Sequence, residues 1–275
     1  MKKIIYAISC IIALFSLASC DWFVLDNLDG WDAQVEGKII DQGTNQPIQM
    51  EQGSSFQVYE LYGEQYAYTH GTQKDANGNE IKGWDGSSSI SWAVKNNGTY
   101  VNKLTFAGKY RFQPTSGNFK ADPQFFDLKK GANTQDFNAT PYLRIKNPNI
   151  SMSGKVINAT FDVEVAVAGT TVNRVEICVF PDRWVRHSQN NCGNDPGAYI
   201  VNPTGTSFAL SVDPDRIVKQ GDNDIKVNAV EFQYDRIHYI RIAALGQNPS
   251  NSGNAYNYSP VYKLEKGQIT EVTDW

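Results

Sequence analysis

Histidine and cysteine, the side chains that most often bind zinc, are scarce in this sequence. The 275 residues include three histidines, His70, His187 and His238, and four cysteines. No histidine belongs to an H-E-x-x-H or H-x-x-E motif, so no zinc-protease signature is present. The G-x-S-x-G pattern of serine hydrolases is also missing. We therefore expect no metal, no cofactor and no catalytic residue, with the reservation that groups distant in sequence can meet in the fold.

Basic residues are too few to suggest a nucleic-acid surface. The chain has 25 Lys and Arg against 29 Asp and Glu, which gives a formal net charge of -4 at pH 7. No stretch combines clustered basic residues with interleaved aromatics. Because nucleic-acid binding depends on positive charge, nucleic acid is not an expected partner.

The first twenty residues have the pattern of an export signal. Met1-Lys2-Lys3 gives a basic start, and an apolar run follows from Ile4 to Phe15. The run is too short for a permanent transmembrane helix and is typical of a signal peptide. It ends in Leu17-Ala18-Ser19-Cys20, which resembles the lipobox of bacterial lipoproteins. We expect cleavage before Cys20 and lipidation of Cys20, with each buried methylene of the acyl chains contributing about 0.8 kcal/mol to membrane attachment.

Acidic residues follow Cys20 closely, and they predict where the anchored protein is sent. Asp21, Asp26, Asp29 and Asp32 are interleaved with aromatic and apolar residues. This arrangement is similar to the signal that exports Bacteroidetes lipoproteins to the outer face of the outer membrane. The alternative is a solvated linker with incidental charge. We expect a lipid-anchored outer-membrane protein exposed on the cell surface.

Short alternating apolar runs between turn residues predict an all-β protein with two β-sandwich domains in tandem. The clearest runs span residues 35–41, 56–62, 90–94 and 110–112 in the first part of the chain, and 157–167, 175–179 and 208–212 in the second. Trp92 alternates with apolar neighbours and is expected in the core. The predicted boundaries are 1–19 for the signal peptide, 20–33 for a lipidated acidic tether, 34–139 for the first sandwich and 140–275 for the second.

Several of these runs resemble known families. Residues 35–41, with Gly98-Thr99-Tyr100 and residues 106–110, are similar to the carboxypeptidase regulatory-like domain, a transthyretin-like sandwich that has no peptidase activity. Residues 239–244 and 258–261 resemble the last two strands of a fibronectin type III or immunoglobulin-like sandwich, with Ile240, Ile242 and Ala244 facing inward. The whole arrangement resembles a family of Bacteroidetes lipoproteins, domain of unknown function 3823.

This resemblance implies a function as well as a fold. Members of the family are typically encoded beside glycan-uptake systems, which implies a non-catalytic surface lipoprotein that is accessory to polysaccharide binding and uptake. Polysaccharide and outer-membrane glycan transporter proteins are then the expected partners, besides the membrane. The alternative is a structural module that docks onto an envelope transporter complex and has no ligand of its own. An enzyme is the least favoured hypothesis.

Two loops contain the candidate glycan-binding residues. Sugar rings stack on exposed aromatic side chains while neighbouring polar groups bond their hydroxyls. The first candidate loop holds Tyr66 and a glycine-flanked Trp84-Asp85 pair. The second holds Arg183 and Trp184. For each tryptophan, ligand contact and packing within the protein are equally consistent with the sequence.

A disulfide is expected around the second loop. Cys10 is lost with the signal peptide and Cys20 carries lipid, so Cys178 and Cys192 are the cysteines that remain. In an oxidising compartment such an isolated pair predicts one disulfide. The bond would restrain the loop that contains Trp184 and lower the entropy cost of presenting it to a ligand.

Overall fold

The structure is a computed structural model that describes residues 30–51, 53–61, 73–74, 80–81, 89–114, 116–226, 236–249 and 255–275. All regular elements in these residues are β-strands, which confirms the all-β fold class. None of the described residues forms a helix with the length and apolar character that a membrane crossing requires. The predicted signal peptide, Cys20 and most of the tether lie outside the described residues.

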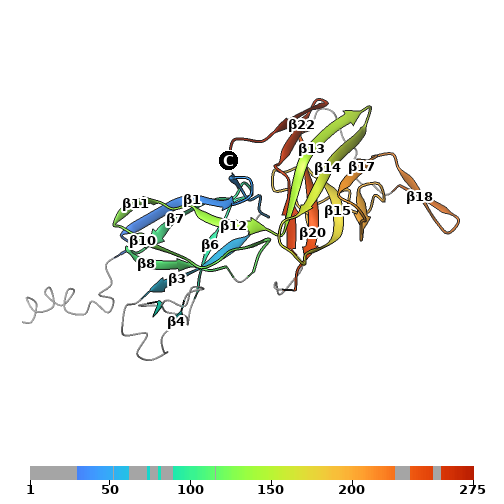
Figure 1. Ribbon diagram of the computed structural model, residues 1–275. Helices are drawn as coiled ribbons and strands as arrows, with labels where there is room; N and C mark the ends of the chain where they lie inside the picture. Colours follow the sequence, from blue (N-terminus) through green and yellow to red (C-terminus); the bar gives the residue numbers. More distant parts are fainter. Residues whose placement is uncertain are drawn as a thin grey trace, which may run out of the picture.

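The first half of the chain has two main sheets packed face to face, and a separate two-stranded sheet of β4 and β5 (Figure 1). One sheet is centred on β1 and the other has the strand order β10-β8-β3-β6. The strands of this half are β1 (Ala33–Asp41), β2 (Gln46–Pro47), β3 (Ser55–Leu61), β4 (Gln73–Lys74), β5 (Glu80–Ile81), β6 (Ile90–Ala93), β7 (Thr99–Thr105), β8 (Gly108–Phe112), β9 (Phe119–Lys120), β10 (Gln124–Leu128), β11 (Gly131–Thr134) and β12 (Phe137–Pro141).

Strand β1 holds the first sheet together because it is paired along both of its edges. It runs antiparallel to β7 and β2 and parallel to β11 and β12. Val35 and Ile39 are buried, while Glu36 and Lys38 are exposed, as the period-two pattern predicts. Gly37 lies between them because a Cβ atom there would collide with the carbonyl oxygen of Gln135, in the link from β11 to β12.

Aromatic rings fill the space between the two sheets of the first half. Phe56 lies at the centre and makes edge-on contacts with Trp92 at 5.9 Å and Phe112 at 5.3 Å between ring centroids. Phe112 and Phe137 are stacked at 4.2 Å and thus connect the two sheets. Trp92 is 3% exposed, so its predicted place in the core is confirmed. Edge-on and stacked pairs of this kind add to the stabilisation from burial.

The second half also has two main sheets, β13-β14-β17 and β16-β15-β20-β22-β23, with β21 beside β20. Ile240, Ile242 and Ala244 of β20 are fully buried between them, as predicted. The strands are β13 (Leu143–Ser153), β14 (Val156–Val165), β15 (Thr171–Phe180), β16 (Tyr199–Val201), β17 (Ser207–Val212), β18 (Ile217–Gln220), β19 (Asn223–Lys226), β20 (His238–Gln247), β21 (Ala255–Tyr258), β22 (Tyr262–Glu265) and β23 (Gln268–Glu271).

The end of the second half differs from the prediction. Residues 239–261 were expected to contain the last two strands, but β22 and β23 follow them. Both β21 and β22 pair with β20, at its two ends. Pro260 lies in the interruption between them and has no N–H to continue the ladder, so strand pairing with β20 stops at Tyr258 and resumes at Tyr262.

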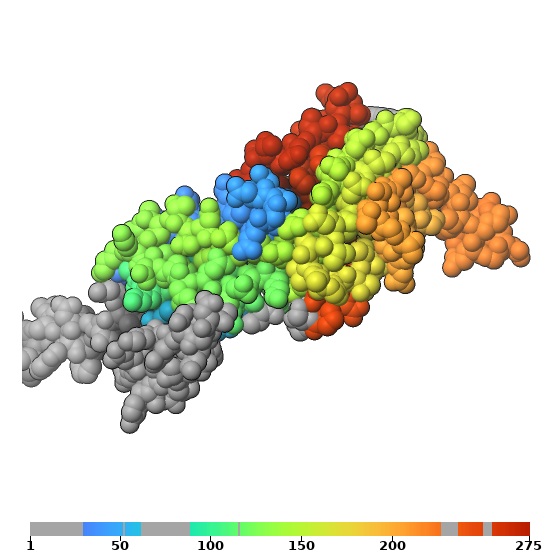
Figure 2. All heavy atoms as spheres, in the orientation of Figure 1, coloured from blue at the N-terminus to red at the C-terminus, as the bar shows by residue number. Residues whose placement is uncertain are grey.

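The hairpin of β18 and β19 projects from the body at the end remote from the first half (Figures 1 and 2). Ile217 and Ile225 on this hairpin are 62% and 38% exposed. At the other end, strand β12 leads directly to β13, so the two halves adjoin where the chain passes from Pro141 to Leu143.

Candidate functional site at the junction of the two halves

A fully buried arginine ties the two halves together. Arg241 of β20 donates from Nη1 to the carbonyl oxygen of Met50 at 2.7 Å and from Nη2 to that of Asn96 at 3.2 Å, both in the first half. Its Nε donates to the carbonyl oxygen of Ser259 at 2.8 Å. The guanidinium lies over the Tyr258 ring at 4.4 Å. Burial lowers the pKa of Arg241 to about 10, so the side chain remains a cation at neutral pH.

A second tie joins β1 to β13 through a carboxylate and a guanidinium. Arg144 donates from Nε and Nη2 to the two oxygens of Asp41, at 2.6 and 2.8 Å, and from Nη1 to Glu164 at 2.6 Å. Asp41 also accepts hydrogen bonds from the Gly43 N–H and the Thr44 hydroxyl. The two-pronged geometry fixes Arg144 in one orientation. A Cβ at Gly43 would overlap this guanidinium, which explains the glycine.

The buried side chain of Asn257 makes the third tie. Its Oδ1 accepts from the Leu143 N–H at 3.0 Å, and its Nδ2 donates to the Asn118 carbonyl oxygen at 2.8 Å. One amide thus satisfies backbone groups on both sides of the junction. Together with Arg241 and Arg144, it holds the two halves in one arrangement.

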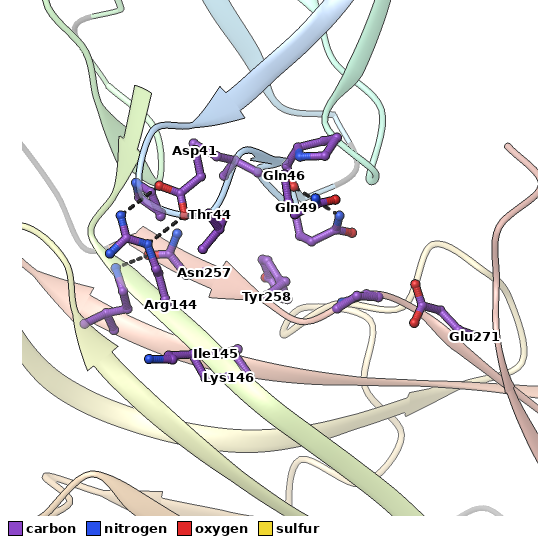
Figure 3. Close-up of a pocket in the computed structure, with 15 residues that line it drawn as sticks. Asp41, Thr44, Gln46, Gln49, Arg144, Ile145, Lys146, Asn257, Tyr258 and Glu271 are labelled. Atoms are coloured by element: carbon purple, nitrogen blue, oxygen red, sulfur yellow. Dashed lines mark hydrogen bonds and ion pairs between the residues drawn. The ribbon is translucent and has the colours of Figure 1, made fainter. Parts of the chain in front are cut away.

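A cleft of about 300 Å³ lies at this junction (Figure 3). Strand β2 and the residues after it supply one wall with Gln46 and Gln49, and the second half supplies the other with Tyr258 and Glu271. Pro47, Pro141 and Pro260 add apolar surface. This volume is at the lower end of the range for ligand pockets. The mixture of amide, carboxylate and ring surfaces suits a small polar ligand with apolar faces, such as a sugar ring.

The predicted Arg183-Trp184 loop lies at the same junction. The carbonyl oxygen of Arg183 accepts from the side chain of Asn96 in the first half at 3.4 Å. Trp184 is half-buried, and its ring lies against that of Trp275, with centroids 6.3 Å apart and planes at 45°. Arg183 donates to the Asp274 carbonyl oxygen at 3.2 Å, and its guanidinium is 5.7 Å from the Trp275 ring centre. The two rings therefore anchor the loop to the C-terminal segment while part of each indole stays exposed.

The C-terminal segment connects the paired tryptophans to the cleft. Glu271 lines the cleft, and Trp275 is four residues further on. A chain of four residues spans at most about 14 Å. Figure 1 shows this segment returning from β23 toward the turn that follows β1. Trp184, Trp275 and the cleft thus belong to one region of the surface, which we call the junction site.

The other predicted glycan-binding residues cannot be placed beside this site. Tyr66, Trp84 and Asp85 lie outside the described residues. Their predicted role remains a prediction. In the described part of the chain, no group of three or more His, Cys, Asp or Glu side chains has the arrangement to bind a metal.

The predicted disulfide is absent, because Cys178 and Cys192 are both free thiols. Cys178 packs with Val185 and Ala243 on the outer face of β15, whereas Cys192 belongs to the core between the sheets. The sequence separation is compatible with a bond, but the strand places the two side chains in different apolar clusters. The loop is held by hydrogen bonds instead: Asn190 accepts from the Val179 and Cys192 N–H groups and donates to Ile177.

Both thiols should therefore be unreactive until the protein unfolds. Burial raises the pKa of Cys178 well above its usual range and that of Cys192 to about 12, so neither forms the nucleophilic thiolate at neutral pH. We expect the chain from Asp21 onward to resist alkylation when native and to take up two alkyl groups in denaturant without reductant. Intact-mass measurement counts the alkyl groups. If the denatured protein took up none, Cys178 and Cys192 would be joined in a disulfide after all.

A further polar cluster lies on the outer face of β15 and was not foreseen. Glu176 is 1% exposed, and its carboxylate accepts from Arg174 Nε at 2.6 Å and lies 2.6 Å from His187 Nδ1. His187 comes from the same loop as Trp184 and stacks on Tyr256 at 4.4 Å. Arg174 lies over the ring of Tyr199 at 3.8 Å.

Sequence reasoning missed most members of these sites because they are isolated polar residues within apolar strand patterns. Arg241 alternates with Ile240 and Ile242 and would ordinarily be assigned to a solvated face. Glu176 has the same position between Val175 and Ile177. One signal was available in the sequence. A strand with apolar residues on both of its faces is expected to be covered on both faces, so an isolated charged residue within it is expected to be buried as well.

Solved structures share this fold. A protein of Bacteroides uniformis ATCC 8492 that is provisionally named a carbohydrate binding protein is 25% identical, with a TM-score of 0.63 over 88% of the chain and 100% of its own length. DUF3823 family proteins of Parabacteroides merdae ATCC 43184 and Bacteroides ovatus ATCC 8483 are 21% and 18% identical, with TM-scores of 0.59 and 0.58. They match 86% and 85% of the chain and 100% and 99% of their own lengths.

Other comparisons gave no match: no protein-family model and no curated protein matches the chain. The fold is thus that of the DUF3823 family structures, and none of the three names is that of an enzyme.

Proposed function

We propose that this chain is a non-catalytic lipoprotein of the DUF3823 family, anchored through Cys20 in the outer membrane and exposed on the cell surface, which binds polysaccharide at the junction site. The lipobox and acidic tether support the anchor and its location. The fold shared with a protein provisionally named for carbohydrate binding supports the ligand class.

The pairing of Trp184 with Trp275 beside the cleft is the observation that carries this proposal. Two partly exposed indole rings offer apolar faces for the C–H surfaces of sugar rings. Gln46, Gln49 and Glu271 in the adjoining cleft provide donors and acceptors for hydroxyl groups. Because the junction is tied by buried polar contacts, the site is formed before the ligand arrives and loses little entropy on binding.

The test is a glycan array with the chain from Asp21 onward, beside a Trp184→Ala variant. We expect the variant to bind about 30-fold more weakly than the wild type, the effect of losing an aromatic hot spot of about 2 kcal/mol. Trp31→Ala is the matched control, because Trp31 is 60% exposed, precedes β1 and should leave binding unchanged when replaced. Equal binding by wild type and Trp184→Ala would refute the junction site.

A protein-docking role is the alternative, and the β18–β19 hairpin favours it. Ile217 and Ile225 are exposed on an element that stands clear of the body (Figure 2). Exposed strand edges and apolar side chains are used in protein contacts. Crosslinking from position 217 on intact cells discriminates, because only this alternative requires a partner in stoichiometric amounts.

A further inference from the structure

We infer that the outer face of β15 carries a second sugar subsite, made by Arg174, Glu176, His187, Tyr199 and Tyr256, and that the sugar it accepts is uncharged. This inference rests on the proposed glycan-binding function and specifies that the glycan bound is an uncharged one. These five residues lie outside the cleft, and none of them was predicted from the sequence.

Glu176 is the fixed centre of this subsite. A carboxylate that is 1% exposed is costly to bury unless its oxygens are bonded. Here each oxygen has a partner that lies nearer the surface: Arg174 bonds Oε2 and His187 bonds Oε1. The side chains of Arg174 and His187 are 19% and 44% exposed. The buried carboxylate therefore holds two surface side chains on either side of it in fixed positions.

The atoms that these partners present to solvent are complementary. Nδ1 of His187 lies 2.6 Å from a carboxylate oxygen, which favours a proton on Nδ1; in the form of the ring with one proton, Nε2 is then an acceptor. Arg174 uses Nε for Glu176, so that bond leaves the N–H donors of its two Nη groups. A sugar hydroxyl is both a donor and an acceptor. A pair of hydroxyls on neighbouring carbons can therefore bond His187 and Arg174 together.

Aromatic rings support both polar groups. Tyr256 lies parallel to the His187 ring, with planes at 19°, and Tyr199 lies beneath the Arg174 guanidinium. Both tyrosines are half-buried, so part of each ring surface is exposed. Stacking removes rotamer freedom from His187 and Arg174 before a ligand binds. The exposed part of the tyrosine rings supplies the apolar surface that the C–H face of a pyranose needs.

The charges of this face exclude an anionic sugar as the preferred ligand. Two arginines near the subsite are paired with carboxylates: Arg174 with Glu176, and Arg186 with Glu51 at 3.5 Å. These two pairs carry no net charge, and the chain as a whole has a net charge of -4. A uronate or sulfate group would meet repulsion from these carboxylates. An uncharged sugar meets none.

The experiment measures binding of the chain from Asp21 onward to neutral glucans, mannans and galactans, and to polygalacturonate and chondroitin sulfate as carboxylate and sulfate arms. We expect binding to a neutral glycan and none to either acidic one. Tyr199→Ala and His187→Ala should each weaken that binding about tenfold, the loss of one good contact. Phe125→Ala is the control, because Phe125 is a 45% exposed aromatic in the first half and should have no effect.

Tyr199→Ala keeps both bonds to Glu176, so this variant tests the subsite even if His187→Ala loosens the loop. Thermal melting shows whether each variant is folded. Preferred binding to an acidic glycan overturns the inference. So does unchanged binding by both variants; if Trp184→Ala still loses binding in that case, the proposed function stands without this subsite. A wild type that binds no glycan overturns both.

Discussion

Replacing Arg241 by alanine should lower the free energy of unfolding by about 3–5 kcal/mol, the range for disrupting a buried, fully bonded polar network. Arg241 has 0% exposure, and its loss removes charge-assisted hydrogen bonds to Met50, Asn96 and Ser259 and leaves a cavity the size of its side chain. Because two of these bonds cross the junction, we also expect the halves to unfold at separate midpoints.

Guanidinium unfolding followed by tryptophan fluorescence and circular dichroism measures both effects. Two probes with one shared midpoint in the wild type and different midpoints in Arg241→Ala would show that cooperativity between the halves is lost. Lys219→Ala is the control, since Lys219 is 79% exposed on the projecting hairpin. A change below about 1 kcal/mol would mean that Arg241 does not hold the junction.

Asp41→Asn should cost about 3 kcal/mol, because it removes the buried one of the two carboxylates that bond Arg144 and leaves only Glu164, which is more exposed and is shared with Lys146. Asp41 is 4% exposed, and four hydrogen bonds converge on its two oxygens. An amide can accept through only one of its two terminal atoms, so the geometry cannot be kept. Asp215→Asn is the control, as that exposed carboxylate pairs with Lys155 and Lys226 and should leave stability unchanged.

The same substitution should alter the response to acid. Burial raises the pKa of Asp41, but hydrogen bonds from Arg144, Gly43 and Thr44 together lower it by more than burial raises it. The pKa of Asp41 therefore lies below its usual value. A lowered carboxyl pKa contributes stability that is present above about pH 4 and is lost as the pH falls through the folded-state pKa. The stability difference between wild type and Asp41→Asn should therefore shrink below about pH 4, as measured by urea unfolding. A constant difference down to pH 2 would contradict this origin.

Most strands could be predicted from the sequence because the sheets of each half turn one face toward the core, which produces alternating apolar and polar residues along each strand. Period-two alternation in residues 157–167 corresponds to β14, and that of residues 239–244 to β20. The polar stretch from Gly131 to Asn138 gave no such signal, yet it forms β11 and the start of β12. These strands pair parallel to β1, and distant parallel pairing depends on contacts that no local pattern records.

The sequence singled out a residue of the candidate site only where the residue type itself is unusual in its context. Trp184 could be singled out because tryptophan in a polar loop is unusual, and it does lie at the junction. Its partner Trp275 comes from the far end of the sequence, and only the fold brings the two rings together. Glu176 and His187 are eleven residues apart on different elements. Which carboxylate meets which ring nitrogen is a three-dimensional property, so neither residue stood out.

The pairing of β1 on both edges also bears on how the molecule would carry a load. Fluid flow past a cell exerts a force on any surface protein that is bound to a large polymer. If the chain is tethered through residues before Gly30 and holds a glycan at the junction, the tension passes lengthwise through Ala33–Asp41. The hydrogen bonds to β7, β11 and β12 lie across that direction, so they must yield together in shear instead of opening one at a time. Under that loading the first sheet would resist extension along β1.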